Sequence, residues 1–206
     1  ARAVQTLRDS LEHSIPRESG WLILRPFEWL WALGTRLDRT IRRGSRAVAA
    51  PVISVGNLTV GGAGKTPLTR WLAEQLPNVA VLTRGYGREA GEPLIVRPGE
   101  FPPVSQTGDE AQTLIRAQAA VIGIGADRRS LAARLEAEFS PDYFVLDDGL
   151  QHWPMVRDLD IVLVDVQDPF GGARLLPTGR LREPLRALER AGIIVLTRVE
   201  PGRSYP

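Results

Sequence analysis

Short, nearly continuous apolar runs recur along the chain, and polar or glycine-rich turns separate them. We interpret these runs as strands because they are short and rich in Val, Ile and Leu. A strand at a solvated surface would alternate apolar and polar residues, whereas an apolar run is typical of a strand covered by helices on both faces. The predicted strands are residues 51–55, 79–83, 121–124, 143–146, 161–164 and 193–196.

Between the runs, the apolar residues recur at helical spacing, which predicts helices over residues 68–76, 109–119, 127–139 and 183–191. Alternating strands and helices indicate a doubly wound α/β domain with a mostly parallel sheet, which we assign to residues 51–206. Ligands of such domains bind at the C-terminal ends of the strands. The loops 85–108 and 166–182 are long for a compact domain, which usually indicates function or mobility.

Residues 1–50 are predicted as a separate amphipathic helical segment, with nine arginines against five acidic residues. Three tryptophans lie here, Trp21, Trp29 and Trp31. From Phe27 onward one helical face is apolar and another is basic, with Leu30, Leu33, Leu37 and Ile41 on the first and Arg36, Arg39 and Arg43 on the second. This pattern suits an anionic membrane surface, and it equally suits a helix packed on its own domain. The run Trp21–Leu33 is too short and too often interrupted by charges to span a bilayer.

The composition is ordinary for a soluble globular protein, with 43% hydrophobic and 24% charged residues and a net charge of +2. The absence of cysteine excludes disulfides and thiolate metal sites, which is consistent with the cytoplasm. We expect no nucleic-acid partner and no obligate protein partner.

The only lysine of the chain, Lys65, lies in a glycine-rich turn directly after the first predicted strand. An ammonium on a flexible stem reaches between nucleotide phosphates, where a planar guanidinium fits poorly. Thr66 supplies a hydroxyl for Mg²⁺, and the helix that follows offers its N-terminus to phosphate. Thr59 stands where the strict phosphate-loop pattern has glycine, so a ligand-free turn is the alternative. The predicted nucleotide-binding residues are Thr59, Gly61, Gly62, Ala63, Gly64, Lys65 and Thr66.

Two adjacent carboxylates, Asp147 and Asp148, end the strand predicted at 143–146. They would repel each other without a cation, which favours a bound metal ion or a basic partner over two solvated acids in a turn. Asp109 begins a predicted helix and has Gln112 three residues later, which is the pattern of a capping box. From this pattern alone, a helix cap is a better interpretation of Asp109 than a general base.

Other charged residues occur in loops that follow strands. Arg84 and Arg88 flank a glycine-containing loop that is suited to phosphate or to a plain basic turn. Arg182 and Glu183 precede a predicted helix, and a plain helix start explains them nearly as well. The two histidines of the chain, His13 and His152, have too little in common for a metal site.

Five segments together carry a family resemblance: Asn57–Pro67, Thr83–Arg88, Gly108–Glu110, Asp147–His152 and Leu181–Pro184. In this order they resemble tetraacyldisaccharide 4'-kinase, a lipid A pathway enzyme. The resemblance covers almost the whole chain and accounts for Thr59, since the family's loop is similar. It implies a P-loop NTPase-like fold that transfers the γ-phosphate of ATP to the 4'-hydroxyl of tetraacyldisaccharide 1-phosphate, forming lipid IVA. It also implies peripheral or monotopic association of residues 1–50 with the cytoplasmic face of the inner membrane.

The resemblance also implies roles for individual residues. Lys65 and the loop amides hold the phosphates, and Asp109 is the base toward the sugar hydroxyl. The Mg²⁺ ligands are then Thr66, Glu110, Asp147 and Asp148. Residues that bind substrate or phosphate are then Arg84, Arg88, Gln151, His152, Arg182 and Glu183.

Members of this family are substantially longer than this chain, which ends at Pro206 before a later region that contributes a histidine partner to the catalytic aspartate. We therefore expect a kinase domain that is C-terminally truncated. Two alternatives stay open: a P-loop ATPase or GTPase switch acting on a protein partner, and an inactive nucleotide-binding fragment.

Overall fold

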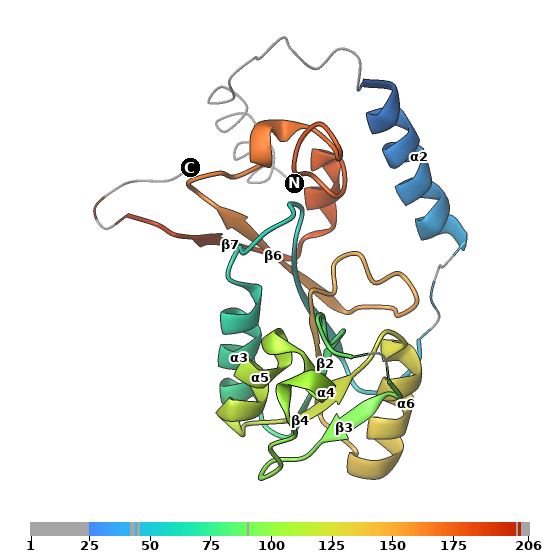
Figure 1. Ribbon diagram of the computed structural model, residues 1–206, viewed down its shortest axis with the longest axis vertical. Coiled ribbons are helices and arrows are strands. Elements are labelled where there is room, and N and C mark those ends of the chain that lie inside the picture. The colour runs from blue at the N-terminus through green and yellow to red at the C-terminus, as the bar shows by residue number, and fades with distance from the viewer. Residues whose placement is uncertain (1–24, 42–43, 45, 90, 201, 203–206) are drawn as a thin grey trace. The chain divides into compact units, whose positions relative to one another are not determined.

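The computed structural model describes residues 25–41, 44, 46–89, 91–200 and 202 (Figure 1). The predictions about His13, Trp21 and Arg43 lie outside these residues. Contacts divide the chain into two compact units, which are described separately. The first comprises residues 1–42, 57–63 and 161–206, and the second comprises residues 43–56 and 64–160. The predicted division of the chain at residue 50 stays a prediction.

The second unit is built on a mostly parallel sheet in the strand order β3-β4-β2-β5-β1. Parallel pairing joins β1 to β5, β5 to β2 and β2 to β4, and β3 alone runs antiparallel, against β4. The strands are β1 (Val52–Asn57), β2 (Val79–Thr83), β3 (Leu94–Val96), β4 (Val121–Ile124) and β5 (Tyr143–Asp147). The predicted doubly wound α/β class is confirmed.

Helices cover both faces of this sheet. On one face, Leu131 and Leu135 of α6 (Arg128–Phe139) join a buried cluster with Leu82 and Phe144. On the other face, α3 (Lys65–Gln75) and α5 (Asp109–Ala117) pack against each other (Figure 1). Because side chains alternate along a strand, Asp147 at the end of β5 lies on the α3 face, where Thr69 of α3 contacts it.

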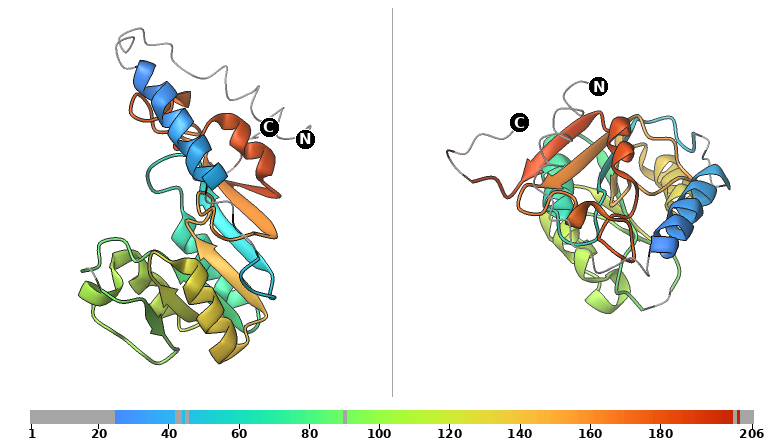
Figure 2. Two further views of the ribbon diagram at one scale, coloured as in Figure 1. Left: turned by 90° about the vertical axis from the view of Figure 1, so that its right-hand side faces the viewer. Right: turned by 90° about the horizontal axis from the view of Figure 1, so that it is seen from above.

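The first unit contains α2 (Arg25–Ile41), β6 (Leu159–Asp165) and β7 (Ile193–Thr197) (Figure 2). β6 and β7 pair in parallel from Ile161 opposite Ile193 to Asp165 opposite Thr197. Two short 3₁₀ helices, η2 (Gly171–Ala173) and η3 (Leu185–Arg190), lie between these strands in the sequence. Among the helices that the structure describes, none is long and apolar enough to cross a membrane.

Two predictions of elements are wrong. The helix predicted over 183–191 is the shorter η3, because Pro184 is extended and restricts the residue before it to extended backbone. The loop predicted over 85–108 contains β3 and the one-turn helix α4 (Val104–Thr107). The sequence did not predict β3 because its three apolar residues lie between Pro93 and the polar Arg97. A run of this length is too short to be recognised as a strand.

Candidate functional site

The glycine-rich turn links the end of β1 to the first residue of α3. Gly64 is the N-cap of α3 with a φ of 86°, and Gly61 has a φ of 117°, so both positions favour glycine. Thr59 instead forms an isolated antiparallel bridge with Leu181, and its hydroxyl accepts a hydrogen bond of 3.1 Å from Nδ2 of the Asn57 side chain. The departure from the strict pattern therefore has a structural cause, since position 59 belongs to a bridge and not to a glycine turn.

Lys65 begins α3 and directs its ammonium toward the end of β5. Its Nζ lies 3.7 Å from Oδ1 of Asp148, and the Lys65 side chain is largely buried. Asp148 has a φ of 48°, an uncommon left-handed backbone for a non-glycine residue. The structure thus brings together the lysine and one of the two strand-end carboxylates that the sequence predicted as a site.

Asp147, the last residue of β5, is only 2% exposed. Thr69 Oγ1 donates to it at 3.0 Å and Thr83 Oγ1 donates at 3.4 Å, each to a different carboxylate oxygen. The pKa of Asp147 is raised to about 6, mainly by burial and also by the charges of Asp148 and Glu110, while the hydrogen bond from Thr69 opposes the shift. The carboxylate is therefore fixed in place and costly to ionise without a nearby cation.

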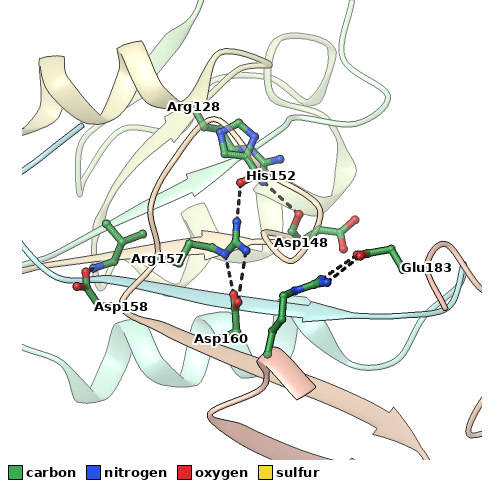
Figure 3. A network of polar contacts seen from close by, with 9 residues as sticks. Arg128, Asp148, His152, Arg157, Asp158, Asp160 and Glu183 are labelled. Carbon is green, nitrogen blue, oxygen red and sulfur yellow. Dashed lines mark hydrogen bonds and ion pairs between the residues drawn. The ribbon is translucent and has the colours of Figure 1, made fainter. Parts of the chain in front are cut away.

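A buried arginine that the sequence did not single out supports this strand end. Arg128, the first residue of α6, donates from Nη1 to the carbonyl oxygen of Asp147 at 2.9 Å. The same nitrogen donates to the carbonyl oxygen of Asp148 at 3.2 Å (Figure 3). Burial lowers the pKa of Arg128 to about 10, although the two aspartates oppose the shift. Arg128 holds the backbone that presents both carboxylates. Nothing in the sequence separates it from the 24 other arginines, because its role depends on burial.

The start of α5 corrects the interpretation of Asp109 as a helix cap. Gly108 is the N-cap, and in the described part of the chain no side chain caps this helix. The side chain of Gln112 instead donates to the carbonyl oxygen of Pro102 at 2.9 Å and to Thr107 Oγ1 at 2.8 Å. Asp109 and Glu110 are exposed at the helix N-terminus. Asp109 is therefore available for chemistry.

Two of the predicted motifs lie against each other. A Cβ atom on Gly108 would lie 2.2 Å from the carbonyl oxygen of Tyr86, and one on Gly85 would lie 3.2 Å from the carbonyl oxygen of Thr107. The loop of Arg84 and Arg88 therefore contacts the start of α5 through backbone at both glycines. This close contact is possible because neither glycine has a side chain.

Arg84 and Arg88 have different surroundings in this loop. Arg88 donates to the carbonyl oxygens of Ile124 at 3.1 Å and Glu92 at 2.7 Å, and also to that of Gly91. These bonds hold the loop. Arg84 is exposed, and its charge lowers the pKa of Arg128 further after burial, the main cause. A basic region therefore lies beside the aspartates, and the binding of phosphate by either arginine stays a prediction.

Gln151 and His152 lie in the loop after β5. This loop packs on β1, since the Gly149 amide donates to the Val55 carbonyl at 3.0 Å. Arg157 donates to the His152 carbonyl at 2.7 Å and binds Asp160, with Nε 2.7 Å from Oδ1 (Figure 3). His152 is buried and Gln151 is half-buried. Contact of either residue with a substrate stays a prediction.

Arg182 and Glu183 belong to the other unit. The Arg182 amide donates to the Leu58 carbonyl at 2.7 Å, and the Arg182 carbonyl accepts from Trp31 Nε1 at 2.9 Å. The buried carboxylate of Glu183 accepts two hydrogen bonds from Arg190, at 2.9 and 3.1 Å (Figure 3). Arg190 is a partner that the sequence pattern did not indicate, and a role of Glu183 in substrate binding stays a prediction.

A cavity of about 500 Å³ lies within the same unit, between α2 and the segment that follows η2. Three arginines and several apolar residues line it. The lining residues are Glu28, Arg36, Ala173, Arg174, Leu175, Leu181, Pro184, Leu185 and Arg186. This combination suits a ligand that carries both an anionic group and an apolar part.

The donors near Lys65 fit Mg²⁺ better than a metal held by protein alone. In the residues described, no group of three or more His, Asp or Glu is arranged to hold a metal ion. Mg²⁺ commonly uses one or two carboxylates and takes its other ligands from phosphates and water. The Thr66 hydroxyl, at the start of α3, and the Asp147 and Asp148 carboxylates, at the end of β5, are donors of that kind.

Comparison with protein families matches residues 20–205 to the family described as Tetraacyldisaccharide-1-P 4'-kinase. The Tetraacyldisaccharide 4'-kinase of Pelobacter propionicus is 41% identical, over 94% of this chain and 57% of the relative. That of Geobacter sulfurreducens is 44% identical, over 93% of this chain and 54% of the relative. The crystal structure of LpxK from Aquifex aeolicus in complex with ATP superimposes with a TM-score of 0.78 at 36% identity, covering 89% of this chain and 61% of that one. The chain thus spans little more than half the length of the relatives that it matches.

Proposed function

Because the chain belongs to the tetraacyldisaccharide-1-P 4'-kinase family, we propose that it transfers the γ-phosphate of ATP to the 4'-hydroxyl of tetraacyldisaccharide 1-phosphate. The product is lipid IVA, in lipid A biosynthesis. One observation carries this proposal. Lys65 begins a helix at a glycine turn and lies 3.7 Å from Asp148, next to the buried carboxylate of Asp147.

The triphosphate binds along the glycine turn. Backbone amides at the start of α3 donate to phosphate oxygens, with the positive end of the helix dipole behind them. Lys65 moves from Asp148 onto the phosphates and neutralises the charge on the transferred group. The residues assigned to nucleotide binding are Thr59, Gly61, Gly62, Ala63, Gly64, Lys65 and Thr66.

Thr66, Asp147 and Asp148 would hold Mg²⁺. Glu110, which the resemblance also assigns to the metal, does not form a metal-holding group with the two aspartates in the described residues, and its charge acts on Asp147 instead. When bound, Mg²⁺ neutralises the charge that accumulates on the phosphate oxygens during transfer. The hydrogen bonds from Thr69 and Thr83 fix Asp147. Arg128 fixes the carbonyl oxygens of both aspartates, so these carboxylates do not need to reorganise when the nucleotide binds.

Asp109 accepts the proton of the 4'-hydroxyl. As this proton leaves, the sugar oxygen forms a bond to the γ-phosphorus, the bond from that phosphorus to the β–γ bridging oxygen breaks, and ADP departs. The exposure of Asp109 and the capping of its helix by Gly108 support this role, because neither ties up the carboxylate. Most of the rate then comes from positioning and charge neutralisation.

The acceptor is an anionic lipid, so arginines are suited to its phosphate. Arg84, Arg182 and Glu183 are assigned to acceptor or phosphate binding, together with Arg88, Gln151 and His152. The cavity of the first unit, with Arg36, Arg174 and Arg186 beside leucine side chains, supports binding of a lipid that carries phosphate.

The protein acts at the cytoplasmic face of the inner membrane as a peripheral or monotopic protein, with α2 on the lipid surface. The apolar residues of this helix support this, since Trp29 is 77% exposed and Ile41 is 79% exposed. Leu30, Leu33 and Leu37 are exposed with them. Such a face suits the boundary between headgroups and acyl chains.

The test is transfer of labelled γ-phosphate from Mg·ATP to tetraacyldisaccharide 1-phosphate in mixed micelles. Lys65→Met keeps an unbranched side chain and removes the charge, so labelled lipid should fall by about 100-fold or more. The matched control is Arg97→Met, which removes a charge from an exposed arginine paired with Glu100 and Glu138. Undiminished transfer by Lys65→Met would refute the role of Lys65. Consumption of ATP without labelled lipid would favour a regulatory ATPase.

A further inference from the structure

The backbone carbonyls of the glycine turn have their own donors. If the amides of this turn face phosphate, its carbonyls need donors elsewhere. Arg180 donates to the Val60 carbonyl from Nε at 3.2 Å and from Nη2 at 2.8 Å. Arg198 donates to the Gly62 carbonyl from Nη2 at 3.0 Å. Two arginines from distant segments therefore contact alternate carbonyls of one short turn.

Each arginine is in turn held by a carboxylate. Nη1 of Arg180 lies 2.6 Å from Oδ2 of Asp168, and Nη1 of Arg198 lies 2.9 Å from Oδ2 of Asp165. Asp165 is buried at the end of β6, and its other oxygen accepts from the Gln167 amide at 3.0 Å. Because a guanidinium is planar, the carboxylate on one edge fixes the direction of the N–H groups on the other.

The turn is also shaped to receive Arg180. A Cβ atom on Gly61 would lie 2.4 Å from Nη2 of Arg180, so glycine at this position leaves room for the guanidinium. Backbone pairing reinforces the contact, since the Val60 amide donates to the Arg180 carbonyl at 2.8 Å. Arg180 therefore contacts the turn through both its side chain and its backbone.

We propose that Arg180 and Arg198, each oriented by an aspartate, are positioning residues that keep the amides of residues 61–63 turned toward the nucleotide phosphates. This rests on the proposed ATP site. The two arginine side chains are 49% and 54% exposed. Ion pairs this exposed contribute little to global stability. Their effect is local: without them the turn samples other conformations, and the nucleotide has to order it on binding.

The experiment compares Arg180→Met and Arg198→Met with the parent protein. It measures amide hydrogen exchange in the turn without nucleotide, and the affinity for Mg·ATP. In nucleotide-free protein, hydrogen exchange of the amides of residues 61–63 should become faster in both variants. The Kd for Mg·ATP should rise about 5-fold in each, as expected for the loss of one typical hydrogen bond, and more in the double variant. The melting temperature and the KM for the lipid acceptor should stay unchanged. Arg97→Met, which removes an arginine of similar exposure, should change none of these quantities.

The Asp168→Asn variant distinguishes an effect of Arg180 orientation on ATP binding from an effect of net charge alone. Removing this carboxylate makes the region more positive, so a purely electrostatic effect would tighten binding of the anionic nucleotide. Positioning predicts the opposite, because Arg180 loses its orienting partner and Mg·ATP binds more weakly. Arg180→Lys should likewise weaken binding, since an ammonium does not span the Val60 carbonyl and Asp168 as the guanidinium does.

Unchanged exchange in both methionine variants, or tighter ATP binding by Asp168→Asn, would overturn the proposal. A parent protein that binds no ATP, but whose exchange still accelerates in the variants, would refute the proposed function and leave the positioning role in place.

Discussion

At the scale of the residue, the site depends on groups that are costly to bury. Asp147 has a carboxylate in a nearly closed environment, held by two threonine hydroxyls. Arg128 has a buried guanidinium whose contacts are backbone carbonyls. The sequence identified Asp147 because it ends an apolar run, whereas Arg128 could not be identified, because burial is a property of the folded chain.

The pKa of Asp147 leads to a prediction about stability. Its folded value, about 6, is above the ordinary 3.8, so the folded state binds the proton more tightly. Stability is therefore lost as pH rises between these two values and stays reduced above them. Asp147→Asn should raise the free energy of unfolding at pH 8 by roughly 1–3 kcal/mol without Mg²⁺, and change it little near pH 3. Urea titrations at both pH values measure this, and a variant less stable than the parent at pH 8 would contradict it.

Asp158 leads to a prediction of opposite sign. Its carboxylate accepts a 2.9 Å hydrogen bond from the Val52 amide at the start of β1 and binds Arg46. The Val52 hydrogen bond, and then Arg46, lower the pKa of Asp158 below 3.8. The stabilisation is therefore present above pH 4 and is lost as pH falls through the lowered value.

Asp158→Asn should cost about 1 kcal/mol at pH 7, a figure reduced for the exposure of this carboxylate. The difference from the parent should shrink below about pH 3. Chemical denaturation across this range is the measurement. A constant difference at every pH would assign the effect to packing instead of charge.

At the scale of the element, the sequence predicted the strands whose residues are all buried. It failed where contacts outside the element decide the local backbone. The long apolar runs became β2, β4 and β5 within a residue of their expected bounds. The helix predicted over 183–191 became η3, and Asp109 did not cap α5, because Gln112 donates to Pro102 and Thr107. In the first case the geometry of Pro184 overrode the local pattern, and in the second it was overridden by hydrogen bonds from Gln112 to residues that precede the helix.

The exposed face of α2 predicts membrane binding. Trp29→Glu should weaken binding to anionic vesicles by about 10-fold, because burial of an indole ring in the headgroup region is lost and a negative charge is added. Trp71→Glu is the matched control: Trp71 is an exposed tryptophan of α3. Flotation of the two variants with lipid vesicles makes the comparison. Equal loss in both would show that α2 is not the contact.

At the scale of the whole molecule, two compact units share the chain, and one boundary between them in the sequence falls in the glycine-rich turn, before Gly64. The sequence predicted the strand and helix order but not this grouping, because contacts between segments distant in sequence leave no periodic signal. The match also leaves almost half of each relative's length uncovered.

Binding of nucleotide should stabilise the molecule as a whole. At 100 times its Kd, Mg·ATP should raise the free energy of unfolding by about 2.7 kcal/mol. Lys65→Met should lose most of this gain, while Arg97→Met should keep it. Thermal unfolding with and without Mg·ATP measures the effect, and equal stabilisation of the parent and Lys65→Met would show that the nucleotide binds elsewhere.

The close approach of Gly108 to Tyr86 has a consequence for how the protein tolerates change. A methyl group at position 108 would lie 2.2 Å from the Tyr86 carbonyl, and one at position 85 would lie 2.5 Å from Cγ2 of Ile124 and 3.2 Å from the Thr107 carbonyl. A side chain at position 108 would need a shift of the Tyr86 backbone, and one at position 85 would need a shift of Ile124 and a left-handed backbone that side chains rarely adopt. In a library of random variants we expect these two glycines to be almost invariant, while the exposed Tyr86 between them accepts many side chains.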